Sequence, residues 1–170
     1  MRKEMVVLRH STKDMVLAGM GIALVFVATL INIKLPIGQG GLIHLGNVPL
    51  FLFAILFGKK TGAIVGSFGM GLFDLMGGWT PWAPATFMIV GLMGYTVGLV
   101  AERNDSTVGY VLAVVLACVI KVAGYYVAEA LIYGNWVQPV LSIPGNLMQI
   151  GVAALIVLPM AGTLKKALKR

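Results

Sequence analysis

The chain has 170 residues, of which 59% are hydrophobic and only 11% are charged. A soluble domain of this size cannot bury so much apolar surface, so the composition excludes a soluble fold and indicates a protein of the lipid bilayer. The formal net charge of +7 would fit nucleic acid, but the basic residues gather at the two chain ends and in short internal turns. That pattern is typical of the cytoplasmic side of a membrane protein, so we expect both termini to be cytoplasmic.

The first predicted helix covers residues 14–33 and carries several small residues. Gly19 and Ala23 are four residues apart, a spacing that lets a second helix approach closely. The sequence leaves open whether that second helix belongs to this protein or to a partner.

A glycine-rich loop at 34–44 follows, in which Gln39 and His44 are candidate lid residues. The loop is equally consistent with an ordinary connection. The next predicted helix, 47–57, is too short for a hydrocarbon core of about 30 Å at about 1.5 Å per residue. We therefore expect the loop before it to dip into the membrane beside a cavity, where irregular backbone is tolerated.

Four further helices are predicted, at 61–76, 84–101, 108–133 and 144–164. A loop with two tryptophans and two prolines joins helices 61–76 and 84–101, and a short polar turn joins helices 84–101 and 108–133. The sequence therefore predicts an all-α integral membrane protein, a single domain over 1–170 with six transmembrane helices.

Three ionisable residues interrupt these apolar segments: Asp74, Lys121 and Glu129. A charge at the bilayer centre costs at least about 2.5–3.5 kcal/mol, so each needs a partner or a function. Lys121, Tyr125 and Glu129 share one helix face through their four-residue spacing. We expect these residues to meet others at the outer ends of their helices around a polar ring-shaped solute. The candidate binding residues are Asn47, Asp74, Trp79, Trp82, Lys121, Tyr125, Glu129, Asn146 and Gln149.

Simpler explanations exist for several of these residues. Lys121 would also be explained by a buried structural ion pair with Asp74 or Glu129. The tryptophans would also be explained as anchors at the membrane interface.

The sequence also lacks several functional motifs. It has no GxxxxGK[ST] loop for ATP, no metal-ligand spacing and no nucleophile beside a base. We therefore expect neither an enzyme nor a bound metal or cofactor.

The sequence resembles a known family through its motifs: LGN at 45–47, LFGKKTGAIVG at 56–66, FDLMGGWTPWAPATF at 73–87, and the small residues of the first helix. These resemble the substrate-binding S components of energy-coupling factor (ECF) vitamin transporters, closest to the hydroxymethylpyrimidine or pyridoxine type. The resemblance implies a bacterial plasma-membrane protein that captures a vitamin or precursor from outside. It also implies a transmembrane coupling subunit of the EcfT type, docked at Gly19 and Ala23, and two ABC-type ATPases.

The residues alone permit a second function. Asp74 and Glu129 would serve as relay carboxylates in a stand-alone proton-coupled transporter of small molecules. Uptake by the isolated protein, driven by a pH gradient without ATPases, would distinguish that function from a binding subunit.

Overall fold

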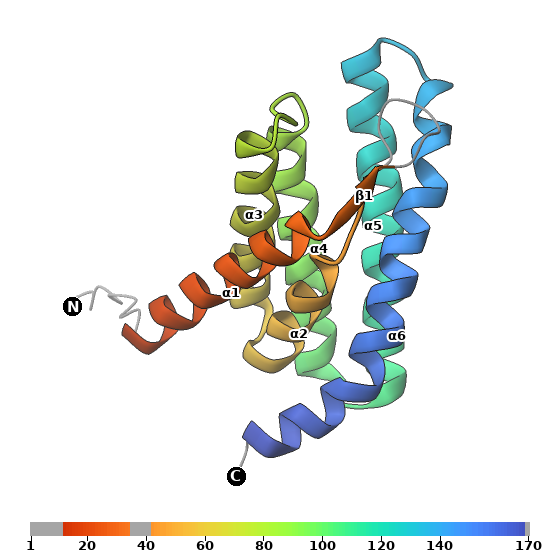
Figure 1. The fold of residues 1–170 in the computed structure, drawn as a ribbon. Coiled ribbons are helices and arrows are strands. Elements are labelled where there is room, and N and C mark those ends of the chain that lie inside the picture. The colour runs from red at the N-terminus through yellow and green to blue at the C-terminus, as the bar shows by residue number, and fades with distance from the viewer. Residues whose placement is uncertain (1–11, 35–41, 169–170) are drawn as a thin grey trace, which may run out of the picture.

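The computed structural model describes residues 12–34 and 42–168, which form six α-helices, one 3-10 helix and a β-hairpin (Figure 1). In chain order these are α1 (Thr12–Leu30), β1 (Asn32–Lys34), β2 (Leu42–His44), α2 (Asn47–Phe57), α3 (Lys59–Met76), α4 (Ala83–Arg103), α5 (Thr107–Tyr133), η1 (Gln138–Ser142) and α6 (Ile143–Leu168).

Four segments are long and apolar enough to cross a membrane: α1, α4, α5 and the run from η1 through α6. Helix α2 has only 11 residues, and α3 combines 18 residues with four glycines, two lysines and an aspartate. The helical fold of a membrane protein is therefore present, whereas six crossings and cytoplasmic termini remain predictions.

The first helix ends earlier than the sequence suggests, at Leu30 instead of residue 33. Asn32 Nδ2 donates hydrogen bonds of 3.0 Å to the carbonyl oxygens of Thr29 and Leu30, which the last turn leaves unpaired. The backbone then enters β1, which pairs antiparallel with β2, Ile33 opposite Ile43. The fold is helical as predicted, but the ends of the glycine-rich loop predicted at 34–44 contribute to this small hairpin, which the sequence analysis did not predict.

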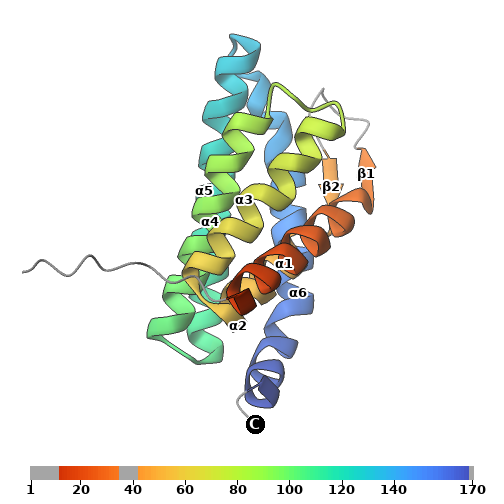
Figure 2. The ribbon, with the colours of Figure 1, turned by 90° about the vertical axis from the view of Figure 1, so that its left-hand side faces the viewer.

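Glycine lets α3 and α4 pack closely side by side (Figure 2). A β-carbon on Gly94 would lie 2.1 Å from the carbonyl oxygen of Gly62, and one on Gly98 would lie 2.4 Å from the backbone of Lys59. Because no real β-carbon tolerates such distances, these positions need glycine for the helices to touch. The pair forms one side of the bundle.

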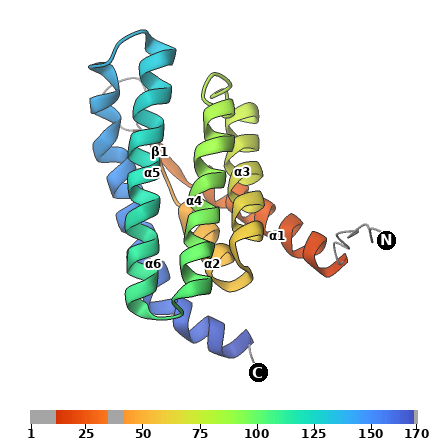
Figure 3. The same cartoon turned by 180° about the vertical axis from the view of Figure 1, so that it is seen from behind.

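Helices α5 and α6 form the other side, and α1 slants across the bundle with its first turns projecting outward (Figures 1 and 3). Pro159 lies inside α6, and beyond it the last turns swing away from the bundle, as expected where proline removes a backbone hydrogen bond. The α3–α4 loop, the α5–η1 connection and the hairpin lie at one end. The α4–α5 turn and the end of α6 lie at the other.

Candidate functional site

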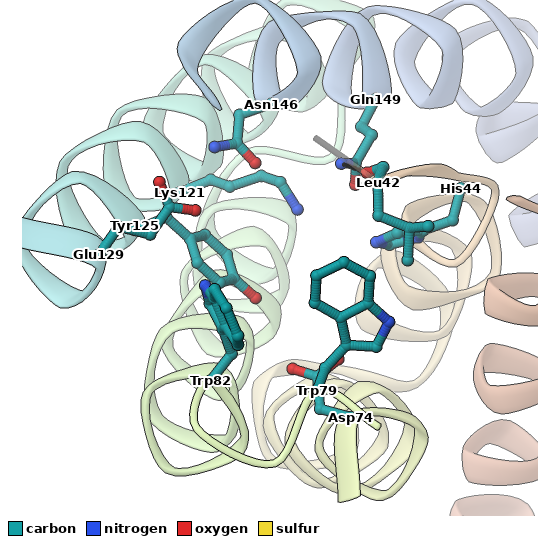
Figure 4. Close-up of a pocket in the computed structure, with 10 residues that line it drawn as sticks. All are labelled: Leu42, His44, Asp74, Trp79, Trp82, Lys121, Tyr125, Glu129, Asn146 and Gln149. Atoms are coloured by element: carbon teal, nitrogen blue, oxygen red, sulfur yellow. Dashed lines mark hydrogen bonds between the residues drawn. The ribbon is translucent and has the colours of Figure 1, made fainter. Parts of the chain in front are cut away.

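A cavity with about 440 Å³ of empty space, including its opening, lies at the hairpin end of the bundle (Figure 4). Its walls come from the hairpin, α3, the α3–α4 connection, α5 and α6. The lining residues are Leu42, His44, Asp74, Trp79, Trp82, Lys121, Tyr125, Glu129, Asn146 and Gln149. They include every candidate binding residue from the sequence except Asn47, together with the lid candidate His44.

One hydrogen-bonded chain joins three helices at the cavity. Thr86 Oγ1 on α4 donates to Asp74 Oδ2 on α3 at 2.5 Å and lies 3.0 Å from Tyr125 Oη on α5. A hydroxyl group has a single proton, so Thr86 accepts from Tyr125 while it donates to Asp74. The chain fixes one oxygen of the Asp74 carboxylate and aims the phenol of Tyr125.

Lys121 reaches into the cavity from the middle of α5 (Figure 4). Its side chain is only 1% exposed, and its Nζ lies 5.2 Å from the centre of the Tyr125 ring. No described carboxylate forms an ion pair with it; the ion pairs found in residues 12–34 and 42–168 are Lys59–Glu102 and Lys165–Asp105. The structural ion pair with Asp74 or Glu129 is therefore not formed in this structure.

Two acceptor oxygens in the cavity wall are buried without a hydrogen-bond partner among the described atoms. They are Oε2 of Glu129 and Oε1 of Gln149, on side chains that are 3% and 5% exposed. Gln149 Nε2 is used, because it donates to the carbonyl oxygen of Leu42 at 2.5 Å. A buried acceptor without a donor is unfavourable by about 1–3 kcal/mol, so these two atoms fit a ligand that brings its own donors.

The aromatic side chains form a row beside the polar groups. Trp79 and Trp82 meet edge to face with ring centres 5.4 Å apart, and Trp82 meets Tyr133 in the same way at 6.0 Å. Both tryptophans line the cavity, where an indole offers a flat ring a stacking surface. Trp136, by contrast, is 58% exposed and does not line it.

Of the two lid candidates, only His44 lies in the described part of the chain. His44 lines the cavity, and its Nδ1 accepts a hydrogen bond from the backbone N–H of Gly46 at 3.2 Å. Nδ1 therefore carries no proton, so the other nitrogen is the one left to contact a ligand. Gln39 lies outside the described residues.

Asn47 does not line the cavity, although the sequence analysis included it. It is fully buried at the start of α2, and neither Nδ2 nor Oδ1 has a partner in the described part of the chain. The structure adds Leu42 and Thr86 instead. Thr86 follows Trp82 by four residues, so the helical spacing could have predicted that it lies near the site. Leu42 could not be predicted in this way, because its position depends on the β-hairpin.

The small residues of α1 separate into two sets. A β-carbon on Gly21 would collide with Val65 and Phe53, so Gly21 serves packing within this chain. Gly19 and Ala23 are exposed, and no described atom lies within 4 Å of a β-carbon placed on Gly19. The structure thus leaves these two positions open to a neighbour.

Metal ligation finds no support in the parts of the chain that the structure describes. No three histidine, cysteine, aspartate or glutamate side chains gather there in a way that would hold a metal ion. The cavity groups instead suit an organic solute with hydrogen-bonding substituents.

Comparisons with known proteins identify the family of this chain. A family model described as the S component of ECF-type riboflavin transporters matches residues 9–166. The thiamine precursor transporter HmpT of Lactococcus lactis subsp. cremoris is 29% identical over 139 residues, which are 81% of this chain and 79% of that protein. An uncharacterized protein of Pyrococcus woesei is 31% identical over 112 residues, 66% of this chain and 74% of its own.

A solved structure shares the fold. It is described as the S component of a bacterial ECF transporter and superposes with a TM-score of 0.74 at 20% sequence identity, covering 95% of this chain and 100% of that one. The chain therefore belongs to the ECF-type riboflavin transporter S component family, a family of multi-pass membrane transport proteins and not of enzymes.

Proposed function

We propose that this chain is the substrate-binding S subunit of an ECF-type ABC importer. It captures a water-soluble vitamin or precursor of the hydroxymethylpyrimidine or pyridoxine type from outside the cell. The observation that carries the proposal is the cavity in which a buried ammonium, two carboxylates, two amides and two indoles converge. Burying so many polar groups inside a membrane is energetically unfavourable, so we expect them to have a function such as ligand binding.

The lining of the cavity supports a ligand with a flat ring and hydrogen-bonding substituents, because indoles and buried polar groups lie side by side there. The relative from Lactococcus lactis is named for a thiamine precursor, which supports a pyrimidine.

The remaining parts of the proposal concern the surroundings of the chain. It lies in a bacterial plasma membrane with six crossings and both termini in the cytoplasm, because the basic turns and tail lie at the end opposite the cavity. Its partners are an EcfT-type coupling subunit and two ABC-type ATPases, since the chain has no P-loop of its own. The coupling subunit docks at Gly19 and Ala23.

Calorimetric titration of the purified chain with hydroxymethylpyrimidine, pyridoxine, thiamine and riboflavin tests the binding role. We expect tight one-to-one binding of one of the single-ring compounds, and at least about tenfold weaker binding by Trp82→Ala, which removes a stacking surface. Trp136→Ala is the matched control and leaves the affinity unchanged, because Trp136 is outside the cavity. Absence of binding by all four compounds would contradict the proposal.

The subunit role needs a separate measurement. We expect no uptake by the chain alone in liposomes with a pH gradient, and uptake after a coupling subunit and two ATPases are added with ATP. Uptake by the chain alone would instead support a proton-coupled transporter that uses Asp74 and Glu129.

A further inference from the structure

A second polar cavity, which we call the tail cavity, lies at the end of the bundle opposite the candidate site. It has about 590 Å³ of empty space, including its opening, and lies between the α4–α5 turn, the first turn of α5 and the last turns of α6. Its lining includes Asp105, Thr107, Tyr110, Lys165 and Lys166. None of these residues lines the first cavity, so the proposed vitamin binding does not explain them.

The length of α6 places the tail cavity at the surface of the membrane. The 26 residues of α6 extend about 39 Å at about 1.5 Å per residue, whereas the hydrocarbon core is about 30 Å thick. Beyond Pro159 the last turns swing away from the bundle and past the α4–α5 turn (Figure 1), so they take up part of this surplus. Lys165 and Lys166 therefore lie at the level of the lipid headgroups, where basic side chains meet phosphate.

Lys165 is held beside the tail cavity by several contacts. Its Nζ pairs with Asp105 Oδ1 at 3.0 Å and lies 3.4 Å from the carbonyl oxygen of Ala101. It also lies 5.8 Å from the centre of the Tyr110 ring, and the hydroxyl group of Tyr110 donates to Asp105 Oδ1. The negative charge of Asp105 is thus compensated within the protein, which weakens its repulsion of an anion.

The tail cavity holds a second ammonium that is not compensated in this way. Lys166 is exposed, and neither ion pair found in residues 12–34 and 42–168 includes it. The start of α5 adds partial positive charge, because the first N–H groups of a helix lack intrahelical acceptors. Ser106 Oγ accepts from the N–H of Gly109 at 3.1 Å, whereas the N–H of Thr107 has no such cap among the described residues. The cavity therefore favours an anion.

An apolar stripe on α5 indicates what kind of anion fits. The stripe begins in the same turn as the cavity, its members are exposed, and their spacing places them on one helix face: Val108, Val111, Leu112 and Val115. In a membrane the neighbours of such a face are acyl chains. An anion in the tail cavity would thus lie directly above a surface for hydrocarbon, an arrangement that suits a lipid better than a soluble phosphate.

From these observations we infer that the tail cavity binds the headgroup phosphate of an anionic membrane lipid, whose acyl chains lie along the stripe on α5. The phosphate accepts hydrogen bonds from Lys166 and from the start of α5. Lys165 adds its remaining N–H, since an ammonium has three donors. A zwitterionic choline lipid fits less well, because its quaternary ammonium would bring a further cation beside two lysines.

Native mass spectrometry of the full chain tests the inference with two lipids that have identical dioleoyl chains. Protein in detergent is mixed with phosphatidylglycerol or phosphatidylcholine, and the dissociation constant of the first bound lipid is measured. We expect phosphatidylglycerol to bind at least about tenfold more tightly, since each basic residue near an anionic surface contributes about a factor of five. Glycerol 3-phosphate should bind at least about tenfold more weakly than phosphatidylglycerol, because it has no acyl chains to cover the stripe.

Three variants locate the site. Lys166→Gln reduces the preference for phosphatidylglycerol by about fivefold, and Lys166→Arg retains it because the positive charge remains. Since Lys166 is exposed, neither change alters the unfolding midpoint in neutral detergent. Lys60→Gln is the matched control and keeps the full preference, because Lys60 is an exposed lysine at the same end of the bundle that lies outside the tail cavity.

Several outcomes would overturn the inference. Equal affinity for the two lipids, or a preference that survives Lys166→Gln undiminished, removes its basis. An equal loss in Lys60→Gln would show a general attraction of anionic lipids to the basic end of the bundle instead of a site. Glycerol 3-phosphate that binds as tightly as phosphatidylglycerol would make a soluble phosphate the ligand. None of these results affects the proposed vitamin binding, which is measured at the other cavity.

Discussion

At the scale of single residues, Thr86 determines how the cavity is held together. It is 1% exposed and connects the Asp74 carboxylate to the Tyr125 hydroxyl, so one side chain of α4 fixes polar groups of α3 and α5. Without it, Asp74 Oδ2 would lose this hydrogen bond in a half-buried position. The residue supports the site without lining the cavity itself.

We predict that Thr86→Val lowers the free energy of unfolding by about 1–3 kcal/mol, because an apolar isostere leaves both hydrogen-bond partners unpaired. Denaturation in detergent measures this change, and calorimetry should show a parallel loss of ligand affinity. Thr86→Ser keeps the hydroxyl and should retain most of both. A Thr86→Val variant as stable as the wild type would show that the chain of hydrogen bonds does not stabilise the fold.

A substitution of Lys121 can distinguish a role in ligand binding from a role in the stability of the fold. Its ammonium is buried without an ion pair among the described residues, so Lys121→Met removes a desolvated charge while keeping an unbranched side chain that is one atom shorter. We predict unchanged or higher stability together with at least about tenfold weaker ligand binding. Lys60→Met, at an exposed position, should change neither quantity.

The opposite result for Lys121→Met, lower stability with full ligand affinity, would identify Lys121 as a structural residue. That result would support the alternative from the sequence analysis, in which Lys121 forms a buried structural ion pair.

At the scale of elements, the contact of α3 with α4 sets where the site residues stand. Asp74 lies near the end of α3, and Thr86 lies in the first turns of α4, so the distance between the two helices decides whether they meet. The helices touch at Gly62 and Gly94, where a β-carbon has no space. The glycines far from the cavity thus contribute to its geometry.

We predict that Gly94→Ala pushes the two helices apart and lowers the unfolding free energy by about 1–3 kcal/mol, as overpacking does in other cores. Thermal unfolding in detergent measures the change. Gly151→Ala is the matched control, because no described atom lies within 4 Å of a β-carbon placed there. Equal stability of the two variants would contradict the role of Gly94 in packing.

At the scale of the whole molecule, the cavity and the open face of α1 are different parts of one chain. Gly19 and Ala23 do not line the cavity, and α1 crosses the bundle at a slant with much of its surface exposed. If Gly19 and Ala23 form the proposed docking surface, substitutions there should leave ligand capture unchanged.

We predict that Gly19→Leu combined with Ala23→Leu abolishes ATP-driven uptake by the reconstituted complex and leaves vitamin binding by the isolated chain unchanged, because leucine blocks close helix approach. Gly151→Leu, at another open glycine, should affect neither. Normal uptake by the double variant would place the docking surface elsewhere on the chain.

Much of this arrangement was predictable from the sequence, for a physical reason. Charged and amide residues are rare in apolar segments, so their positions along the helices alone predicted that Asp74, Glu129, Asn146 and Gln149 lie at one depth. Asn47 fits the same rule but is buried outside the cavity lining, since the rotation of α2 depends on packing that sequence spacing does not reveal. The hairpin escaped prediction because each of its strands has only three residues.

The most direct test of the central claim, that this cavity holds a single-ring vitamin or precursor, is mass spectrometry of the small molecules released from the purified protein. The account predicts a pyrimidine or pyridine with an amino or hydroxyl group, near one equivalent per chain, and much less from Trp82→Ala. Release of a different class of molecule in about one equivalent, or an equal yield from Trp82→Ala, would contradict it.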